Sequence, residues 1–308
     1  MESLGDHTVQ AAEIIVVDNA STDNSAAVVA AHSGAKWIRL GRNQGFAHAV
    51  NTGIQASSGG SVAILNNDVT LAPDCLSILN GTLDRYWFAT PKIVQTADPT
   101  RIDGTFDLTS RAFCSWRAGN GSPASLPVWN RGTEISSAPM TAALFRRSLF
   151  DRVGLLDERF GSYLEDVDFG LRCAQHGLTG WYEPAALASH EGSATLGAWR
   201  PATVRLIARN QVVLARKYGY AGGRWPVFAG QAAWGLLAFK NRAGLAWIQG
   251  KIEGCRAELA SPSEMKLDPS AISTTLRAQE RSMRHLLAET GISEQYWNLY
   301  FKLCGWAD

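Results

Sequence analysis

Residues 14–23 read IIVVDNASTD, an apolar β-branched run followed by a polar turn. Such a run, bounded by polar residues, is typical of a buried strand in a parallel sheet. The Asp, Asn, Ser and Thr residues after it favour a turn and the N-cap of a helix. We therefore expect a strand over residues 13–17 and a helix over residues 25–32.

This strand–helix unit recurs in the first third of the chain. Further strands are predicted at 36–40 and 61–65, and further helices at 46–56 and 76–83. The alternation indicates the α/β class, with a doubly wound sheet that carries helices on both faces. Ligands of such sheets bind beyond the carboxyl ends of the strands, where Asp18 and Asp68 stand.

The middle of the chain is less regular. Residues 90–130 are rich in Gly, Pro, Ser and Thr and are predicted to form a loop-rich connection with short strands. A second compact segment follows over residues 137–193. Its predicted elements are helices at 146–153 and 164–176 and a short strand at 181–182.

The last third is predicted to be helical from Pro201 onward. Its expected helices lie at 203–218, 227–250, 251–259 and 270–290. We therefore expect an α/β domain over residues 1–200, with halves at 1–92 and 93–200, and a C-terminal helical region over 201–308.

The composition narrows the function classes. Lys and Arg total 29 against 28 Asp and Glu, a net charge of +1, so no general positive field gathers nucleic acid. The five cysteines form no CxxC pair and are odd in number, which favours free thiols and a reducing compartment. Residues 1–10 show no signal peptide, and the longest uncharged run, 225–239, is too short to span a membrane. These features favour a cytoplasmic location.

A candidate metal site follows the strand at 61–65, where the chain reads Asn66-Asn67-Asp68. A carboxylate flanked by amides can bind a hard divalent cation through oxygen, and magnesium or manganese would in turn hold a diphosphate. The alternative is a strand-end turn closed by an Asx hydrogen bond.

A candidate general base lies at residues 165–168, which read Glu-Asp-Val-Asp. Three carboxylates in four residues repel one another unless a cation or a catalytic role accounts for them. A general base needs such a carboxylate near an acceptor hydroxyl. The alternative is compensation of the dipole at a helix N-terminus, which explains one or two of the acids.

Two weaker signals lie elsewhere. His190 is able to ligate a metal or pair with a phosphate, and the alternative is an ordinary structural histidine. Residues 43–47, Asn-Gln-Gly-Phe-Ala, look like a loop that leads into a helix N-terminus, which is a natural seat for an anion.

Taken in order, these motifs resemble the glycosyltransferases of family 2, which have the GT-A fold, in their rhamnosyltransferase-like branch. The resemblance covers residues 10–220 and rests on the runs 14–23, 43–46, 65–69, 141–147 and 163–168, with His190 and Asn210. It implies a GT-A-type doubly wound mixed sheet, in which residues 1–92 form the nucleotide-sugar half and 93–200 the acceptor half.

The resemblance also implies roles for individual residues. Asp166 is similar to the general base of the family, with Glu165 beside it. Asp68 and His190 match positions that bind Mg²⁺ or Mn²⁺ and the diphosphate. The implied donor-binding residues are Asp18, Asn19, Asn43, Gly45, Asn51 and Asn67.

The function implied by the resemblance is that of an inverting, metal-dependent hexosyltransferase of cell-envelope polysaccharide biosynthesis. It would move a sugar such as rhamnose from a nucleotide diphosphate to a glycan or lipid-linked hydroxyl. The alternative is a non-catalytic, N-terminally truncated relative that binds nucleotide sugars. A sugar-nucleotide pyrophosphorylase would need a Gly-rich phosphate loop near the N-terminus, and the sequence has none.

The sequence departs from the family pattern in two places. Asn66 stands where the DxD-type metal motif has its first Asp, although an amide oxygen is still able to ligate. The family also begins with a strand and a helix before the strand at 13–17. The chain therefore looks truncated by about one strand and most of one helix, with residues 2–10 resembling the end of that helix.

The C-terminal region carries no catalytic motif, but its helices combine large apolar residues with basic residues at the margins. This combination suits a helix that lies on a membrane surface, and the alternative is packing on the protein's own core. A lipid-linked acceptor would make peripheral contact with the inner face of the cell membrane useful. The residues concerned are Trp225, Val227, Phe228, Trp234, Leu236, Leu237, Phe239 and Trp247, with Arg224, Lys240, Arg242 and Lys251.

Overall fold

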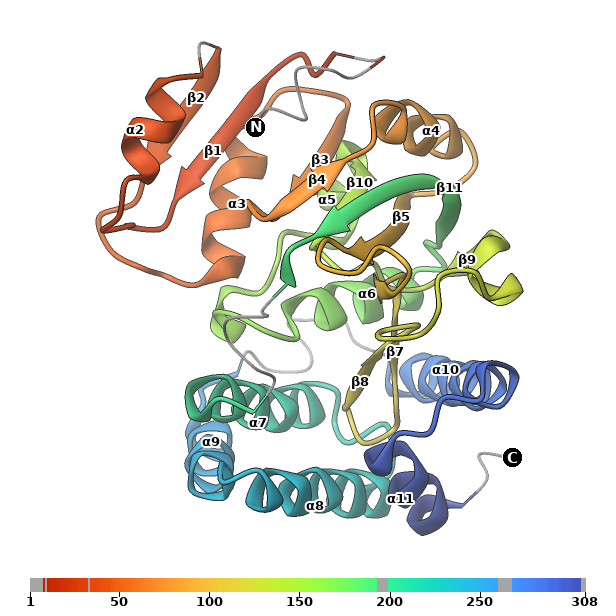
Figure 1. Cartoon of the computed structure of the whole chain (residues 1–308). Coiled ribbons are helices and arrows are strands. Elements are labelled where there is room, and N and C mark those ends of the chain that lie inside the picture. The colour runs from red at the N-terminus through yellow and green to blue at the C-terminus, as the bar shows by residue number, and fades with distance from the viewer. Residues whose placement is uncertain (1–7, 9, 33, 193–198, 260–267, 306–308) are drawn as a thin grey trace.

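The computed structural model describes residue 8 and residues 10–32, 34–192, 199–259 and 268–305. Most of the segment expected to end a preceding helix, residues 2–10, lies outside the described residues. The chain folds into an α/β part at one end and a layer of long helices at the other (Figure 1).

The first unit of the chain is a strand–helix–strand–helix segment. It comprises β1 (Ile14–Asp18), α2 (Ser25–Ala30), β2 (Ala35–Arg39) and α3 (Phe46–Ala56). β1 and β2 pair in parallel, with Ile14 opposite Ala35 and Asp18 opposite Arg39. The two strands form a sheet of their own, separate from the larger sheet. The carboxyl ends of both strands, and the loops after them, therefore lie at one edge.

The larger sheet has seven strands and is mixed. Its main path runs β3 (Ser61–Leu65), β10 (Ala142–Arg146), β5 (Phe88–Gln95), β11 (Gly180–His190) and β4 (Val69–Leu71). The two remaining strands, β6 (Ile102–Gly104) and β9 (Thr133–Ile135), pair with β5 and β11. β11 is parallel to β5, and the other pairs are antiparallel.

Helices cover both faces of this sheet, as β10 shows. Ala142 and Leu144 belong to the apolar cluster of α4 (Cys75–Thr82). Ala143 and Phe145 belong to the cluster of α5 (Arg147–Val153) and α6 (Glu165–Gln175). Alternate residues of a strand point to opposite faces, so one short strand anchors both helical layers. The predicted doubly wound mixed sheet is confirmed.

Two predictions for the middle of the chain were incomplete. The short strand expected at 181–182 is the first part of β11, an eleven-residue strand that continues past Pro184 because its pairing with β5 shifts register between Glu183 and Leu187. The loop-rich segment contains β5 and three-residue strands, including the hairpin of β7 (Asp107–Thr109) and β8 (Ser115–Arg117). A strand of three residues is too short to show the alternation of apolar and polar residues by which strands are predicted.

The helical region begins at Pro201, as predicted. Its helices are α7 (Pro201–Lys217), α8 (Arg224–Lys240), α9 (Gly244–Arg256), α10 (Pro269–Thr290) and α11 (Gln295–Cys304). The helix expected over 227–250 is wrong, because the chain turns between α8 and α9 with Arg242 in the left-handed region at φ 61°. The turn comprises Asn241, Arg242 and Ala243, and Gly244 begins α9, so a glycine next to the turn is a sequence signal of the break.

The β7–β8 hairpin ties this region to the sheet. Trp116 of β8 packs in one apolar cluster with Trp297 and Tyr300 of α11, and that cluster continues into the main sheet. Beside it, Arg111 forms a buried ion pair with Glu280 of α10 at 2.8 Å. The core is thus continuous across residue 200, and the division of the chain there stays a prediction.

All five cysteines are free, as predicted, and three of them are buried. In the described part of the chain, no helix combines the length and the apolar character needed to cross a bilayer.

Candidate active site

Asp68 and His190 meet where two strands of the main sheet lie side by side. His190, the last residue of β11, pairs with Val69 of β4, which places it beside Asp68. The Nε2 atom of His190 lies 3.1 Å from Oδ1 of Asp68, and the backbone N–H of Glu191 donates to the Asp68 carbonyl oxygen at 3.0 Å. Two residues 122 positions apart thus form one polar pair.

The other ring nitrogen of His190 faces a carboxylate that the sequence analysis missed. Asp103 of β6 accepts from Nδ1 at 2.9 Å and is itself 3.4 Å from Nη1 of Arg117. This hydrogen bond raises the pKa of His190, and the charges of Asp103 and Asp68 add to the effect, against the opposing influence of burial. A carboxylate on one nitrogen and a potential metal position on the other is the arrangement that orients ligating histidines.

The pair fits a divalent cation held jointly by protein and substrate. The side chain of Asp68 is 35% exposed, so it is open to a ligand, whereas that of His190 is 8% exposed and held in place. In the described residues no group of three or more His, Cys, Asp or Glu side chains could hold a metal. Magnesium commonly takes one or two protein ligands and completes its shell with phosphate oxygens and water, which two residues can support.

Glu165 and Asp166 open helix α6. Glu165 is 5% exposed, and its Oε2 atom is buried without a hydrogen-bond partner in the described structure. Asp166 is half-buried, and its Oδ1 accepts the N–H of Val167 at 2.8 Å. Burial raises the pKa of both carboxyls, and the charge of Asp166 raises that of Glu165 further. Carboxyls with raised pKa values are suited to proton transfer near neutral pH.

The β7–β8 hairpin adds a third carboxyl to this pair. Asp107 is buried opposite Arg117 in the strand register, and burial together with the charge of Asp166 raises its pKa to about 7. Arg117 faces both groups of acids: it contacts Asp103 beside His190, and its charge lowers the pKa values of Asp107 and Asp166. Arg117 therefore connects the predicted metal pair to the predicted base. The three residues that the sequence did not predict, Asp103, Asp107 and Arg117, each lie on a three-residue strand, where no pattern marks them.

The turn before α6 is strained. Tyr163 and Leu164 both have positive φ, 71° and 67°, which is uncommon for residues other than glycine. The side-chain amide of Asn210, on α7, lies within 2.7–2.9 Å of the carbonyl oxygens of Phe160, Ser162 and Tyr163. Asn210 thereby holds the backbone that presents Glu165, and strain of this kind gathers at functional sites.

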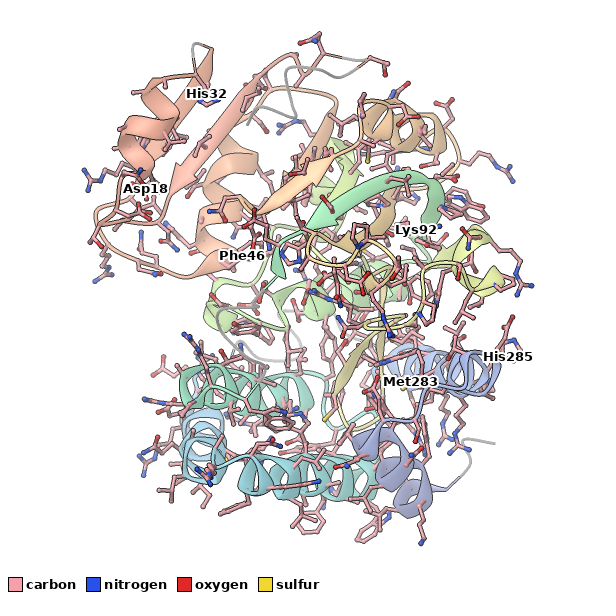
Figure 2. The ribbon with its side chains drawn as sticks, in the orientation of Figure 1. Asp18, His32, Phe46, Lys92, Met283 and His285 are labelled. Carbon is pink, nitrogen blue, oxygen red and sulfur yellow. The ribbon has the colours of Figure 1, made fainter. Side chains whose placement is uncertain are left out.

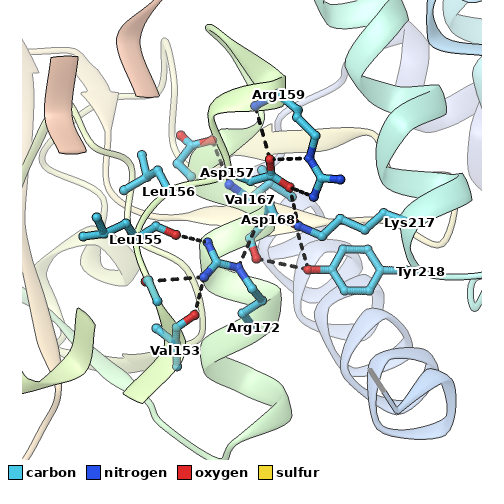
Figure 3. Close-up of polar contacts among 12 residues, drawn as sticks. Val153, Leu155, Leu156, Asp157, Arg159, Val167, Asp168, Arg172, Lys217 and Tyr218 are labelled. Carbon is cyan, nitrogen blue, oxygen red and sulfur yellow. Dashed lines mark hydrogen bonds and ion pairs between the residues drawn. The ribbon is translucent and has the colours of Figure 1, made fainter. Parts of the chain in front are cut away.

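The third acid of the cluster, Asp168, has a structural role. Its side chain is fully buried and contacts Arg172 at 3.0 Å, Lys217 at 2.6 Å and the Tyr218 hydroxyl at 3.0 Å (Figure 3). These partners satisfy its charge, so neither repulsion nor a catalytic role is needed to explain it. Lys217 ends α7, Tyr218 follows it, and Arg172 lies one turn further along α6, so contacts between helices hold this acid in addition to its place in the first turn of α6.

Three predicted donor residues join the loops after β1 and β2. The amide of Asn19 donates to Asn43 Oδ1 and to the Gly45 carbonyl, each at 3.1 Å, and Asn43 Oδ1 accepts the Gly45 N–H at 3.0 Å. Gly45 has φ 90°, and a Cβ there would lie 2.7 Å from the backbone of Gly161, so only glycine fits. The structure thus brings together three residues that the sequence analysis grouped.

Asp18 stands at the carboxyl end of β1 (Figure 2). Its Oδ1 accepts the Ser21 N–H at 2.8 Å, and Arg39 of β2 lies 3.5 Å away. The hydrogen bonds from Ser21 lower the pKa of Asp18, with a smaller contribution from Arg39. Asp18 is therefore an ionised acceptor at the edge where ligands of parallel strands bind. Asn67 lies in the turn between β3 and β4, next to Asp68.

The structure places two further features that the sequence predicts for this region. The N-terminus of α3 offers no open anion seat, because the N–H groups of Phe46 and Ala47 donate to Ser162 Oγ at 3.1 Å and to the Gly161 carbonyl at 2.9 Å. Figure 2 shows Phe46 where the loop enters this helix. Asn51, expected in the donor site, is 3% exposed and bonds the backbone of Leu156 through both ends of its amide. It links α3 to the loop before α6.

The architecture is that of the GT-A glycosyltransferases. GalNAc-T7, solved with UDP, GalNAc and Mn²⁺, matches with a TM-score of 0.56 and 13% identity over 95% of this chain and 50% of its own. A mannosyltransferase from Pyrobaculum calidifontis in complex with GDP-Man and Mn²⁺ matches with a TM-score of 0.50 and 16% identity over 96% of this chain and 82% of its own. At these identities the likeness shows the fold.

The family follows from the sequence match. The model of glycosyl transferase family 2 matches residues 1–154, and the chain belongs to that family. It is 28% identical over 224 residues to the N-acetylglucosaminyl-diphospho-decaprenol L-rhamnosyltransferase of Mycobacterium tuberculosis, covering 64% of this chain and 72% of the relative. It is also 28% identical over 287 residues to the pre-mycofactocin glycosyltransferase of that organism, covering 89% of this chain and 55% of the relative.

Proposed function

We propose that the protein is an inverting glycosyltransferase that uses a nucleotide-diphosphate sugar. The observation that carries the proposal is the polar chain from Asp68 through His190, Asp103 and Arg117 to Asp166. One end of this chain of residues offers a position for a diphosphate, and the other end offers a carboxyl with a raised pKa. Glycosyl transfer by a single displacement needs both. Family membership and the GT-A fold support this assignment.

In the proposed reaction, Asp166 accepts the proton of an acceptor hydroxyl while that oxygen bonds to the anomeric carbon. The bond from that carbon to the diphosphate oxygen breaks on the opposite face, so configuration inverts in one displacement. Asp68 and His190 would hold Mg²⁺ or Mn²⁺, which would supply positive charge to stabilise a departing diphosphate. Glu165 is the residue next to this base, and its buried Oε2 atom has no hydrogen-bond partner in the described structure. We assign it a supporting role in the proton transfer.

The donor is proposed to lie along the carboxyl ends of β1 and β3. Asp18, with Asn19, Asn43 and Gly45, would contact the nucleoside, and Asn67 the region near the metal. Asn51 serves this site indirectly, by fixing α3. Rhamnose from its thymidine diphosphate is the first donor to test, because the relative in Mycobacterium tuberculosis is named as an L-rhamnosyltransferase.

The acceptor is proposed to be a glycan or lipid-linked hydroxyl in cell-envelope polysaccharide synthesis. The rhamnosyltransferase relative is named for a diphospho-decaprenol acceptor, which supports a lipid-linked substrate. We propose that the protein works in the cytoplasm, peripherally on the inner face of the cell membrane.

The first experiment is calorimetric titration of the protein with dTDP and UDP, with and without Mg²⁺ or Mn²⁺. We expect metal-dependent binding that Asp68→Ala abolishes and that Asp74→Ala, a change in an acid at the start of α4, leaves intact. Absence of binding to a folded chain would contradict the donor site. Binding without sugar transfer to any acceptor would favour the alternative, a non-catalytic nucleotide-sugar-binding relative.

A further inference from the structure

Helix α8 exposes a stripe of large apolar residues. Trp225, Phe228, Leu236 and Phe239 are 59%, 68%, 65% and 53% exposed. Their spacing places them on one side of the helix. The other side packs inward, with Val227 and Gly230 buried.

Helix α9 continues this stripe around the turn. Leu245, Ile248 and Ile252 are 76%, 38% and 45% exposed. The ring of Phe239 joins the two helices, since it lies 6.4 Å from the Trp247 ring, edge to face, and covers Gly244. At the other end of α8, the indole N–H of Trp225 donates to the carbonyl of Leu303 at 3.3 Å.

We call this surface the α8–α9 face, and it lies at the end of the molecule opposite β1 and β2 (Figure 1). Its apolar residues are Trp225, Phe228, Leu236, Phe239, Leu245, Ile248, Ile252 and Leu303. Most of the large exposed apolar side chains of the described chain belong to it. Contiguous apolar surface of this kind marks an interaction site.

Among the described residues of helices α8, α9 and α11, the charges beside the face are mostly positive. α8 and α11 contain no acidic residue, and the single acid of α9, Glu253, is paired with Arg205. Exposed basic residues stand at the ends of the helices and in the turn between α8 and α9: Arg224, Lys240, Arg242, Arg256 and Lys302.

We propose that the α8–α9 face docks on an anionic lipid surface. Apolar side chains bordered by Lys and Arg are the composition that seats helices in the headgroup region of a bilayer. The apolar residues enter the boundary between headgroups and acyl chains, while the basic residues contact the phosphates. This inference rests on the peripheral membrane location proposed above and names the surface that makes the contact, whatever the donor or acceptor.

The charge pattern favours lipid over a second copy of the chain. A two-fold dimer through this face would place the same residues on both sides. Its rim would then set Lys240 and Arg242 against other basic groups with no carboxylate of these helices free to pair with them, because Glu253 is engaged. Like charges across an interface oppose association, whereas anionic headgroups complement the rim.

The position of the face also suits the active site. Gly250 and Gly254 of α9 pack closely on the backbone of α7 at Arg205 and Arg209. Asn210, the next residue of α7, holds the turn that presents Glu165. The docking helices are thus rigidly connected to the predicted catalytic helix.

The test is flotation of the full chain with vesicles of phosphatidylcholine, alone or mixed with phosphatidylglycerol. We expect binding to the mixed vesicles that weakens at high salt. Lys240→Gln with Arg242→Gln should reduce affinity about 25-fold, roughly fivefold per basic residue. Phe228→Ser with Leu236→Gln should reduce it at least about tenfold. The matched control is Val28→Ser. Val28 is an apolar residue of α2 whose side chain is 47% exposed, and this variant should bind the vesicles normally.

Other outcomes would overturn the proposal. Equal binding to both vesicle types would show that the face does not recognise anionic lipid. Vesicle binding that the Phe228 and Leu236 changes leave unaffected would show that another surface makes the contact. Concentration-dependent dimers in sedimentation, abolished by those changes and without vesicle binding, would assign the face to a second copy. Thermal unfolding confirms that each variant is folded. The vesicles contain no sugar donor, so failure here is distinguishable from failure of the proposed enzyme activity.

Discussion

His190 shows how single residues acquire a role from neighbours that are distant in the sequence. An isolated histidine is usually structural, and this one is buried and hydrogen-bonded on both nitrogens. Its partners, however, are two carboxylates, one of them half exposed at a strand end. That pairing supports the proposed role of His190 as a metal ligand.

We expect Asp103→Asn to weaken binding of Mn²⁺ in the presence of a nucleoside diphosphate by about 10–100-fold. The amide keeps the shape of the side chain but removes the negative charge that orients and polarises His190. Calorimetry measures the loss directly, without turnover. Asp98→Asn, in an exposed loop acid five residues earlier, should leave the affinity unchanged. Equal affinity in both variants would make Asp103 a purely structural residue.

Asp166→Asn should lower kcat/KM by about 10²–10⁴-fold, because the amide cannot accept a proton. Burial raises the pKa of Asp166, so the folded protein holds this proton more tightly than an exposed Asp does. The rate should therefore rise with pH through an ionisation above the usual Asp range, and the variant should lose that rise. Metal-dependent nucleotide binding should persist. Asp151→Asn, in an exposed acid of α5, is the control.

At the scale of the elements, the start of α6 is set by contacts from other helices. Two consecutive left-handed residues precede Glu165, and neither is glycine. Each such conformation costs on the order of 1 kcal/mol or more, so surrounding bonds must hold it. The amide of Asn210 on α7 and the backbone pairing of Gly161 with α3 are those bonds.

Asn210→Ala should therefore lower kcat by at least about tenfold while leaving the KM for the donor within about twofold. The reason is that the change releases the turn before Glu165, whereas the hydrogen bonds among Asn19, Asn43 and Gly45 do not involve Asn210. Steady-state kinetics separate the two constants. The matched control is Asn298→Ala, which changes an exposed asparagine of α11. A rise in KM alone would show that Asn210 does not position the catalytic helix.

The elements themselves were predicted unevenly. The strand at 61–65 and the helix at 46–56 agree with β3 and α3, since long amphipathic or β-branched runs carry their period within themselves. β6, β7 and β8 have three residues each and depend on pairing partners for their existence. The last helix, α11, was not predicted, although its aromatic residues fill the core beside β8.

At the scale of the whole molecule, a buried ionic cluster joins the α/β part to the helical region. Lys217 of α7 contacts Asp157 at 2.8 Å and Asp168 at 2.6 Å, and its side chain is 3% exposed (Figure 3). Burial opposes ionisation of Asp157, but hydrogen bonds from Arg159 and Lys217 outweigh it and lower its pKa. Each charge of the cluster depends on the others.

Lys217→Met should destabilise the chain by about 3–5 kcal/mol, because it leaves two buried carboxylates short of a cation. Urea unfolding at neutral pH measures the change. Lys36→Met, in an exposed lysine of β2, should alter stability by less than about 0.5 kcal/mol. Part of the loss should be recovered as pH falls, when protonation removes the unpaired charge. A loss no larger than that of the control would show that Arg159 and Arg172 suffice.

The C-terminal helices show what a linear pattern leaves open. The sequence predicts one candidate surface made of twelve apolar and basic residues of this region. The structure divides them: Trp225, Phe228, Leu236 and Phe239 are exposed, whereas Val227 is buried. Lys251 is turned inward, where it donates to Gln211 and Gln231. Burial lowers the pKa of Lys251 to about 7.

The sequence by itself determined the class of sheet, the first strands and helices, the free cysteines and the family. These depend on local periodicity and on ordered motifs, both of which are carried by neighbouring residues. Only the tertiary structure decided that Asp103 and Asp107 face the site, that Asn51 and Asp168 hold the framework, and which side of α8 meets solvent. Those roles depend on contacts between residues as far as 105 positions apart, which no local pattern specifies.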